Sequence, residues 1–234
     1  MFQNRTSTLL TALFLLGLFI APSASAQINA EGSLKFTVGL PRAEFADQLD
    51  ATGFGINMSG AIGFPGSPLL IGLDGGYMLY GHERRNEPFS TTIPDVTVDV
   101  VTDNSVAMGH VFLRLSPDLP GIKPYADALF GFKYFFTETR IESEQFDQNE
   151  ITRSTNFDDT AMSYGFGGGV KITVFNPPGK GGVHIDLGAK YLMGSEAEYL
   201  KEGSIRRQNG QVTFDVNNSR TDMLLIQFGV GMTF

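Results

Sequence analysis

Apolar and polar residues alternate along much of the chain, most clearly in 224–234. Every even position of this segment is apolar, whereas the odd positions are mostly small or polar. Successive side chains of a β-strand point to opposite faces, so the segment has one continuous apolar face. The same alternation recurs in 33–40, 53–64, 69–80, 105–115, 122–137, 161–175 and 183–193. The pattern predicts eight strands.

The connections between these segments alternate between long and short. Turn-forming residues fill the short links at 65–68, 116–121 and 176–182, whereas 41–50, 81–104, 138–159 and 194–221 are longer and polar. In an up-and-down barrel every second link lies at the same rim. An even strand number with long links at one rim is typical of outer-membrane barrels, with periplasmic turns and extracellular loops. We therefore predict an all-β fold, an eight-stranded antiparallel up-and-down transmembrane β-barrel with both termini periplasmic.

One irregularity interrupts the alternation. Apolar residues fall on even positions in 96–100 but on odd positions in 107–115, so the parity changes near Asp103 and Asn104. A β-bulge or a break in the strand produces such a change. We predict it there, with the stretch around Val96 projecting above the membrane.

The bulk of the side chains predicts which face looks inward. An eight-stranded barrel has an interior only wide enough to be filled by side chains. One face is rich in glycine, for example at Gly165 and Gly229, whereas the other is crowded with Phe, Tyr, Leu and Ile. The crowded face cannot fit inside, so it is predicted to face lipid. Four tyrosines on it are candidates for the aromatic girdle at the membrane interface: Tyr77, Tyr134, Tyr164 and Tyr191.

The N-terminus has the pattern of a secretory signal peptide. Arg5 is the only charged residue of 1–26, an apolar run covers 9–20, and small residues precede Gln27. The apolar run is too short for a helix to cross about 30 Å of hydrocarbon. We expect cleavage after Ala26, which leaves one barrel domain at 27–234.

Composition narrows the functional classes. The formal net charge is −8, and an acidic exported protein is a poor partner for nucleic acid. The chain has no Cys, so it has neither disulfides nor thiolate metal ligands. A mean hydropathy of −0.01 is compatible with a barrel that has one polar face.

Ionisable residues of both signs occupy the polar face. Because buried charges must be paired, we predict a network that plugs the lumen. Its members are Asp74, His110, Arg114, Asp127, Lys133, Lys171, Asp186 and Lys190. The alternative is a narrow path for ions or protons.

Motifs for catalysis, metals or cofactors are weak or absent. The chain has three His, and no two of them have ligand spacing. His82 beside Glu83 is weak evidence for a catalytic dyad, and Gly165 to Gly169 lacks the Lys-Ser/Thr of a phosphate-binding loop. We predict no enzyme, no metal and no cofactor.

Together these features resemble the small outer-membrane β-barrel proteins, including the transmembrane domain of outer-membrane protein A and its eight-stranded relatives. The resemblance implies that the last strand is similar to the signal read by the barrel-assembly machinery. The corresponding positions in this chain are Phe228, Val230, Met232 and Phe234. It also implies outer-membrane lipid as a partner, and it leaves the oligomeric state open. Because the sequence stops at the last predicted strand, we expect no extra periplasmic peptidoglycan-binding domain.

We expect a cell-envelope protein with a structural or surface-interaction role. The alternative is a narrow, porin-like channel or a transporter of small hydrophobic molecules. The acidic connection 138–159 is either a solvated loop, extending the strands as a hairpin, or a site for adhesion or divalent-cation bridging to glycolipid.

Overall fold

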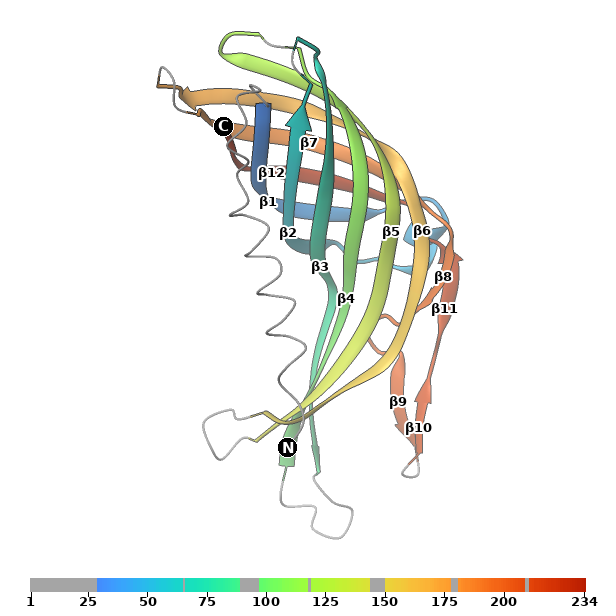
Figure 1. Cartoon of the computed structure of the whole chain (residues 1–234). Helices are drawn as coiled ribbons and strands as arrows, with labels where there is room; N and C mark the ends of the chain where they lie inside the picture. Colours follow the sequence, from blue (N-terminus) through green and yellow to red (C-terminus); the bar gives the residue numbers. More distant parts are fainter. Residues whose placement is uncertain are drawn as a thin grey trace, which may run out of the picture.

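In a computed structural model the chain forms a closed barrel (Figure 1). The structure describes residues 29–64, 66–88, 97–117, 119–143, 150–177, 181–208 and 211–234. The eight strands of the barrel are β1 (Asn29–Pro41), β2 (Gly53–Gly63), β3 (Leu69–Pro88), β4 (Thr97–Leu115), β5 (Ile122–Ser143), β6 (Glu150–Phe175), β7 (Val183–Gly194) and β12 (Met223–Thr233).

Each barrel strand pairs antiparallel with its neighbours in the order β1-β12-β7-β6-β5-β4-β3-β2. The first and last strands close the ring, since Phe36 of β1 lies opposite Phe228 of β12 on one side and Ile56 of β2 on the other. This order confirms the predicted eight-stranded up-and-down antiparallel barrel.

The two faces of the barrel wall are oriented as the size of their side chains predicted. Large apolar side chains point outward, with Leu73 and Phe166 respectively 68% and 62% exposed. Polar and glycine positions point inward, where Lys35 and Asp186 are 1% and 0% exposed. The prediction that the apolar face looks outward is therefore confirmed.

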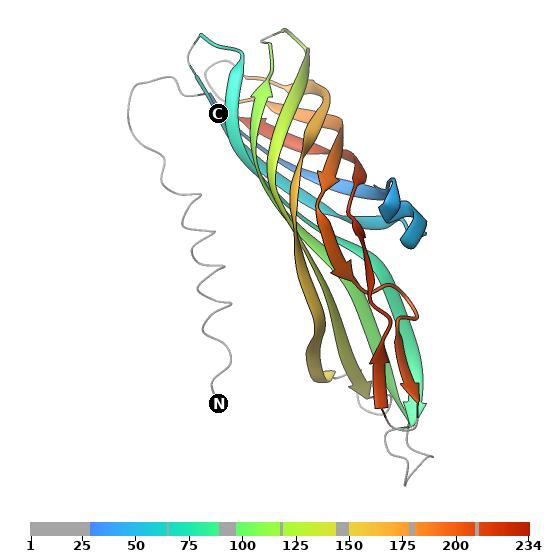
Figure 2. The same cartoon turned by 90° about the vertical axis from the view of Figure 1, so that its right-hand side faces the viewer.

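Four strands extend far beyond the rest of the ring (Figure 2). Strands β3 to β6 have 19 to 26 residues, whereas β1, β2, β7 and β12 have 11 to 13. The segment 81–104, predicted as a long polar connection, is mostly strand, so that prediction is wrong for most of its length. In 138–159 the strands β5 and β6 continue as a hairpin, which is one of the forms predicted for this connection. Both segments continue the ladder, as in the pairs Arg84 with Val101 and Thr139 with Ser154. The Val and Thr residues of this region favour strands, and polar positions are tolerated because both faces lie outside the apolar belt.

A β-bulge lies next to the predicted position, but in the partner strand. The register of β3 against β4 shifts between Leu79 and Gly81, opposite Ser105 and Asn104, so Tyr80 is the extra residue. Strand β4 itself runs through without a break. The bulge changes which residues of β3 face inward above this point.

Short elements cover the end of the barrel that carries the long connections. They are α2 (Glu44–Gln48), β8 (Glu196–Tyr199), β9 (Ile205–Gln208), β10 (Gln211–Phe214) and β11 (Asn217–Arg220). Strand β8 pairs with β11 and β9 with β10, so the connection predicted as a polar loop contains two small two-stranded sheets. The β9–β10 hairpin lies beside the extended end of β3 (Figure 2), where Arg85 Nη1 donates to the carbonyl of Ile205 at 3.0 Å.

The C-terminus lies at the end of the barrel that carries the short turns. The backbone N–H of Phe234 donates to the carbonyl of Ala30 at 2.8 Å, so the beginning of β1 is beside it. The predicted signal peptide lies outside the described residues. Within the described ranges, no helix is long and apolar enough to span a membrane.

We expect Gly131→Ala to lower the free energy of unfolding by about 1–3 kcal/mol, because β5 and β4 touch there. A Cβ at Gly131 would lie 1.9 Å from the carbonyl oxygen of Gly109 in β4. Urea unfolding in lipid vesicles, followed by heat-modifiable gel mobility, measures the loss. The matched control is Gly75→Ala, whose Cβ meets nothing nearer than 4.0 Å. Equal losses in the two variants would contradict the steric explanation.

Candidate functional site: the barrel lumen

The first of three ionic groups in the lumen lies nearest the short turns. Arg114 donates from Nε and Nη2 to the two carboxylate oxygens of Asp127, both at 2.7 Å. Glu31 bridges two cations, since it accepts from Arg114 Nη1 at 2.6 Å and from Lys171 Nζ at 2.5 Å. The four side chains come from four different strands, so the group ties β1, β4, β5 and β6 together.

The second group surrounds the aromatic ring of Tyr125. Arg114 lies over this ring, with its guanidinium carbon 4.1 Å from the centroid. The Tyr125 hydroxyl donates to Asp186 at 2.7 Å, and Lys35 Nζ lies 2.8 Å from the other carboxylate oxygen of Asp186. A cation over a buried aromatic ring is stabilised by the electrons of the ring face, which links this group to the first.

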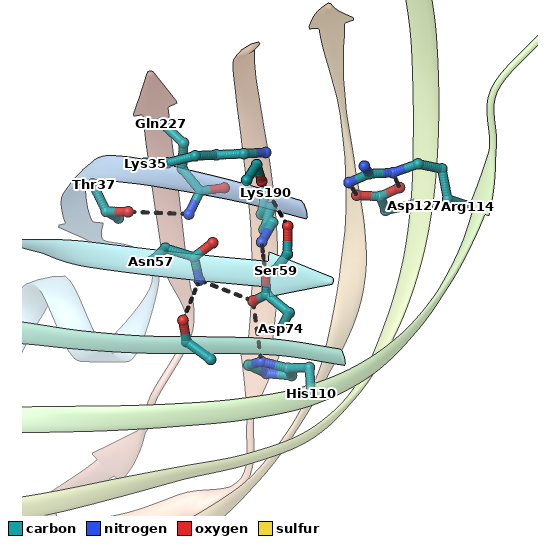
Figure 3. A network of polar contacts seen from close by, with 12 residues as sticks. Lys35, Thr37, Asn57, Ser59, Asp74, His110, Arg114, Asp127, Lys190 and Gln227 are labelled. Atoms are coloured by element: carbon teal, nitrogen blue, oxygen red, sulfur yellow. Dashed lines mark hydrogen bonds and ion pairs between the residues drawn. The ribbon is translucent and has the colours of Figure 1, made fainter. Parts of the chain in front are cut away.

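The third group is centred on Asp74 (Figure 3). Its carboxylate accepts from Lys190 Nζ at 2.5 Å and from the Asn57 amide at 3.1 Å. His110 Nδ1 lies 4.0 Å from the same carboxylate, and His110 Nε2 shares a hydrogen bond of 2.9 Å with the Ser163 hydroxyl. Strands β3 and β7, which are not neighbours in the ring, are joined across the lumen.

The three groups balance their formal charges. Each contains cations within 4.0 Å of carboxylates, so burial of one ion is offset by the other. The cations are Lys35, Arg114, Lys171 and Lys190, and the carboxylates are Glu31, Asp74, Asp127 and Asp186. A set of ions balanced in this way offers no excess of one sign to select permeating ions.

Lys133, a predicted member of the network, lies apart from it. Its side chain is fully buried and donates to the backbone carbonyls of Leu192 at 3.1 Å and of Thr221. These carbonyls belong to the end of β7 and to the residues just before β12. Lys133 therefore holds the base of the 194–221 connection against the wall.

Besides the uncharged Asn57 and Ser163, three members of the ionic groups are absent from the set predicted from the sequence. Glu31 precedes the predicted beginning of the first strand at 33, so the alternation of that strand does not show to which face the Glu31 side chain points. Lys35 alternates with Leu34 and Phe36, and this alternation was the signal that could have identified it as an inward cation. Tyr125 has no charge and becomes part of the site only through its neighbours across the barrel.

Toward the long connections the lumen becomes apolar. Five strands contribute inward side chains that are at most 4% exposed: Met78, Tyr80, Val106, Phe135, Leu192, Met223 and Leu225. We call this set the apolar ring. Two aromatic residues from outside the barrel strands fill its centre, Phe45 from α2 and Tyr199 from β8, with ring centroids 5.0 Å apart. Each packs 5.8 Å from Phe135 of the wall.

A cavity of about 610 Å³ opens at the other end, among the short turns. Its lining includes Glu31, Lys171 and His184, but not the Lys35–Asp186 pair. The cavity therefore ends at the first ionic group.

A carboxylate, an imidazole and a hydroxyl follow one another here as in the catalytic triad of a hydrolase, namely Asp74, His110 and Ser163. Their geometry, however, does not fit a triad. The distance of 4.0 Å between Asp74 and His110 is too long for a hydrogen bond, and Ser163 is fully buried. A buried hydroxyl without a route for substrate is better explained as part of the lumen packing. In the portion of the chain that the structure describes, no group of three or more His, Cys, Asp or Glu could hold a metal ion.

The predicted assembly residues lie on the outer face of β12. Phe228, Val230 and Met232 are all more than half exposed, and Phe234 follows directly after the strand. Their recognition by the assembly machinery stays a prediction. Of the predicted girdle tyrosines, Tyr77 is exposed on this outer face and its hydroxyl shares a hydrogen bond with Ser105 at 2.9 Å.

The extended strands carry ion pairs on the outer surface. Arg84 Nη2 donates to Asp99 at 2.5 Å, and Arg140 donates to Asp103 on the neighbouring strands. The hydrogen bond from Arg84 holds the pKa of Asp99 below the ordinary value of a carboxyl group. A depressed carboxyl pKa stabilises the folded form above the ordinary pKa, and the contribution is lost as the pH falls through the lowered value.

We therefore expect the β3–β4 extension to open in acid. Protection of its backbone amides from hydrogen exchange is expected to fall below about pH 4, because protonated Asp99 no longer accepts from Arg84. Carbon-13 NMR of the Asp99 carboxyl group measures the titration directly. In Arg84→Gln the pKa of Asp99 is expected to rise. An unchanged pKa in that variant would contradict the assignment.

Comparisons with known proteins find similarity to solved structures only. No protein-family model matches the sequence, and no curated protein is similar to it. Among solved structures, the chain is similar to Neisserial surface protein A (14% identity, 89% of this chain and 98% of that one covered, TM-score 0.46). It is also similar to a major outer membrane protein from Thermus thermophilus (14%, 88% and 99%, TM-score 0.40). A third is Ail, the attachment invasion locus protein of Yersinia pestis (14%, 88% and 97%, TM-score 0.37). These TM-scores are below 0.5, so the fold assignment rests on the strand pairing above, and no function is transferred.

Proposed function

We propose that this protein is an integral outer-membrane β-barrel with a structural or surface-interaction role and a lumen closed by its own side chains. The observation that carries the proposal is the distribution of side chains across the wall. Large apolar residues are exposed on all eight strands, whereas paired ions lie inside. In water such a surface would drive aggregation, but in hydrocarbon it is the stable arrangement.

Two successive barriers support a closed lumen. The three ionic groups cross the barrel from wall to wall, and the apolar ring with Phe45 and Tyr199 fills the other end. An ion on this path would have to break buried pairs and then enter an apolar layer without partners. A narrow channel, the alternative from the sequence, is therefore disfavoured.

Topology in the cell follows from the same proposal. The signal peptide at 1–26 would direct export, and the short-turn end with the C-terminus would face the periplasm. The extended strands β3 to β6 and the two small sheets would then stand outside the membrane and offer the surface for partners. Outer-membrane lipid and, during insertion, the barrel-assembly machinery are the proposed partners.

Planar-bilayer recording of the refolded mature protein tests the closed lumen. We expect no unitary conductance above that of the protein-free bilayer, with heat-modifiable gel mobility as the control for folding. Reproducible conductance steps from folded protein would overturn the plug and support the channel. Flotation with outer-membrane fractions and labelling of an external cysteine in the β9–β10 hairpin test the location. Label found only after the cells are permeabilised would reverse the proposed topology.

A further inference from the structure

The apolar end of the lumen is formed by the barrel wall but filled by two aromatic side chains from outside the barrel strands, and Phe45 is one of them. Phe45 is fully buried, although it comes from the five-residue helix α2 in the first long connection. Its ring meets Phe135 of the wall and Tyr199 of β8 edge-on. The part of the apolar ring that Phe45 occupies therefore has the size and chemistry of a benzyl group.

Apart from the buried side chains of Phe45 and Leu49, the contacts that fix α2 to the barrel are weak. A helix of five residues is too short to be stable alone, and it has no side-chain N-cap. Three hydrogen bonds tie the segment down: Arg42 N–H to the Asp222 carbonyl at 2.9 Å, Arg220 N–H to Glu44 at 3.3 Å, and Lys201 Nζ to the Gln48 carbonyl at 3.1 Å. Burial of Phe45 and of Leu49, the residue that follows the helix and is 4% exposed, is thus the main force that keeps α2 in place.

The residue at the start of α2 is strained. Ala43 has φ 50° and ψ −136°, a backbone conformation that is favourable essentially only for glycine. Such strain persists where the surrounding structure enforces it, and it is relieved when the segment moves. Movement of α2 would therefore release backbone strain at Ala43.

The wall around Phe45 is apolar on the side of the mouth and shaped by glycine. Met78 fills the space above Gly39 and Gly53, where added Cβ atoms would come within 2.2 and 2.6 Å of its sulfur. Methionine adapts to irregular spaces, so this part of the wall can adjust to a different occupant. Below it the ionic groups span the lumen, so a molecule that enters stops there.

We propose that the apolar ring is a binding site for a small uncharged aromatic or aliphatic molecule, which enters from the side of the long connections by displacing Phe45. In the unliganded protein Phe45 is the chain's own competitor for the site. This proposal goes beyond the structural role above and does not depend on whether the lumen conducts ions.

Toluene is the natural probe, because it is the side chain of phenylalanine. The wild-type protein, labelled with carbon-13 in its methionine methyl groups and placed in lipid nanodiscs, is titrated with toluene and followed by NMR. The methyl groups of Met78 and Met223, both 1% exposed in the lumen, are expected to shift and reach saturation. Met58, Met162 and Met232 lie on the lipid face and serve as internal controls for toluene dissolved in the bilayer.

Two variants test the displacement. Phe45→Ala removes the competitor and is expected to lower the apparent Kd for toluene at least about tenfold, whereas lipid-facing Phe54→Ala leaves it unchanged. The chain has no Cys, so Glu44→Cys with Arg220→Cys can be crosslinked by a short bis-maleimide to hold α2 closed. Crosslinking is expected to abolish saturation.

Two outcomes overturn the proposal. In the first, Met78 and Met223 in the wild type fail to shift or respond only as the lipid-facing methionines do. In the second, toluene binds to Phe45→Ala but not to the wild type, which would make Phe45 a permanent plug. Neither outcome touches the proposed closed lumen, whose failure appears as conductance.

Discussion

Replacing Arg114 by Met is expected to lower the free energy of unfolding by about 3–5 kcal/mol, the cost of breaking a buried ion pair from one side. The guanidinium has two bonds of 2.7 Å to Asp127 and one of 2.6 Å to Glu31, and all of them would be lost. Methionine keeps much of the volume, so a cavity accounts for little of the effect. Asp127 would be left buried without its cation.

A double-mutant cycle separates the interaction energy of Arg114 with Asp127 from the free-energy cost of burying the two charges. Arg114→Met combined with Asp127→Leu replaces both partners by apolar groups and is expected to recover most of the stability that either single change loses. The control is the Arg84–Asp99 pair on the outer surface, where Arg84→Met is expected to cost far less because water solvates the partner left behind. Urea unfolding in lipid vesicles compares these variants with the wild type. An Arg114→Met variant as stable as the control would show that the lumen is hydrated enough to tolerate an unpaired carboxylate.

Leu73→Arg is expected to destabilise the barrel by about 2–4 kcal/mol, because it puts a charge into the middle of the hydrocarbon. Leu73 is the most exposed large apolar residue of β3 and neighbours Asp74, whose side chain points the other way into the lumen. The same strand also tests how the destabilisation depends on the depth of the charge in the bilayer. Leu69 lies on the same face beside a short turn, and Leu69→Arg is expected to cost only about 0–1 kcal/mol.

A control outside the membrane completes this series. Val212→Arg in the β9–β10 hairpin changes another exposed apolar residue and is expected to stay within about 0.5 kcal/mol of the wild type. Unfolding in vesicles again measures the differences. Three equal values would mean that the outer face of β3 is not in lipid, and the proposed membrane location would be wrong.

Much of the fold could be predicted because successive side chains of a strand face two different environments, so apolar and polar residues alternate along it. The alternation in 224–234 and its seven counterparts depends on each segment alone, so strand number, order and outward face follow without knowledge of the partners. The ends of the long strands could not be predicted in this way. Beyond the apolar belt Val residues are mixed with charged and polar ones, and only the pairing of β3 to β6 shows that residues such as Arg84 and Thr139 continue the ladder.

The candidate site is predictable as a set of inward charges but not as a set of contacts. Asp74 and Lys190 are 116 positions apart on strands that do not pair, and their contact depends on the curvature of the whole ring. Lys133 has the same sequence pattern as the ion-paired residues, yet it donates to backbone carbonyls. Tyr125 enters the site only because three strands bring Arg114, Lys35 and Asp186 around it.

The amino-acid sequence by itself therefore determined an eight-stranded barrel with bulky apolar residues outside and polar residues inside, because residues that face the same environment recur at every second position of a strand. The tertiary structure alone decided which charges meet and that the first connection sends Phe45 into the lumen. The physical reason is that these contacts cross the barrel, and closure of the ring, rather than local sequence, sets what lies opposite.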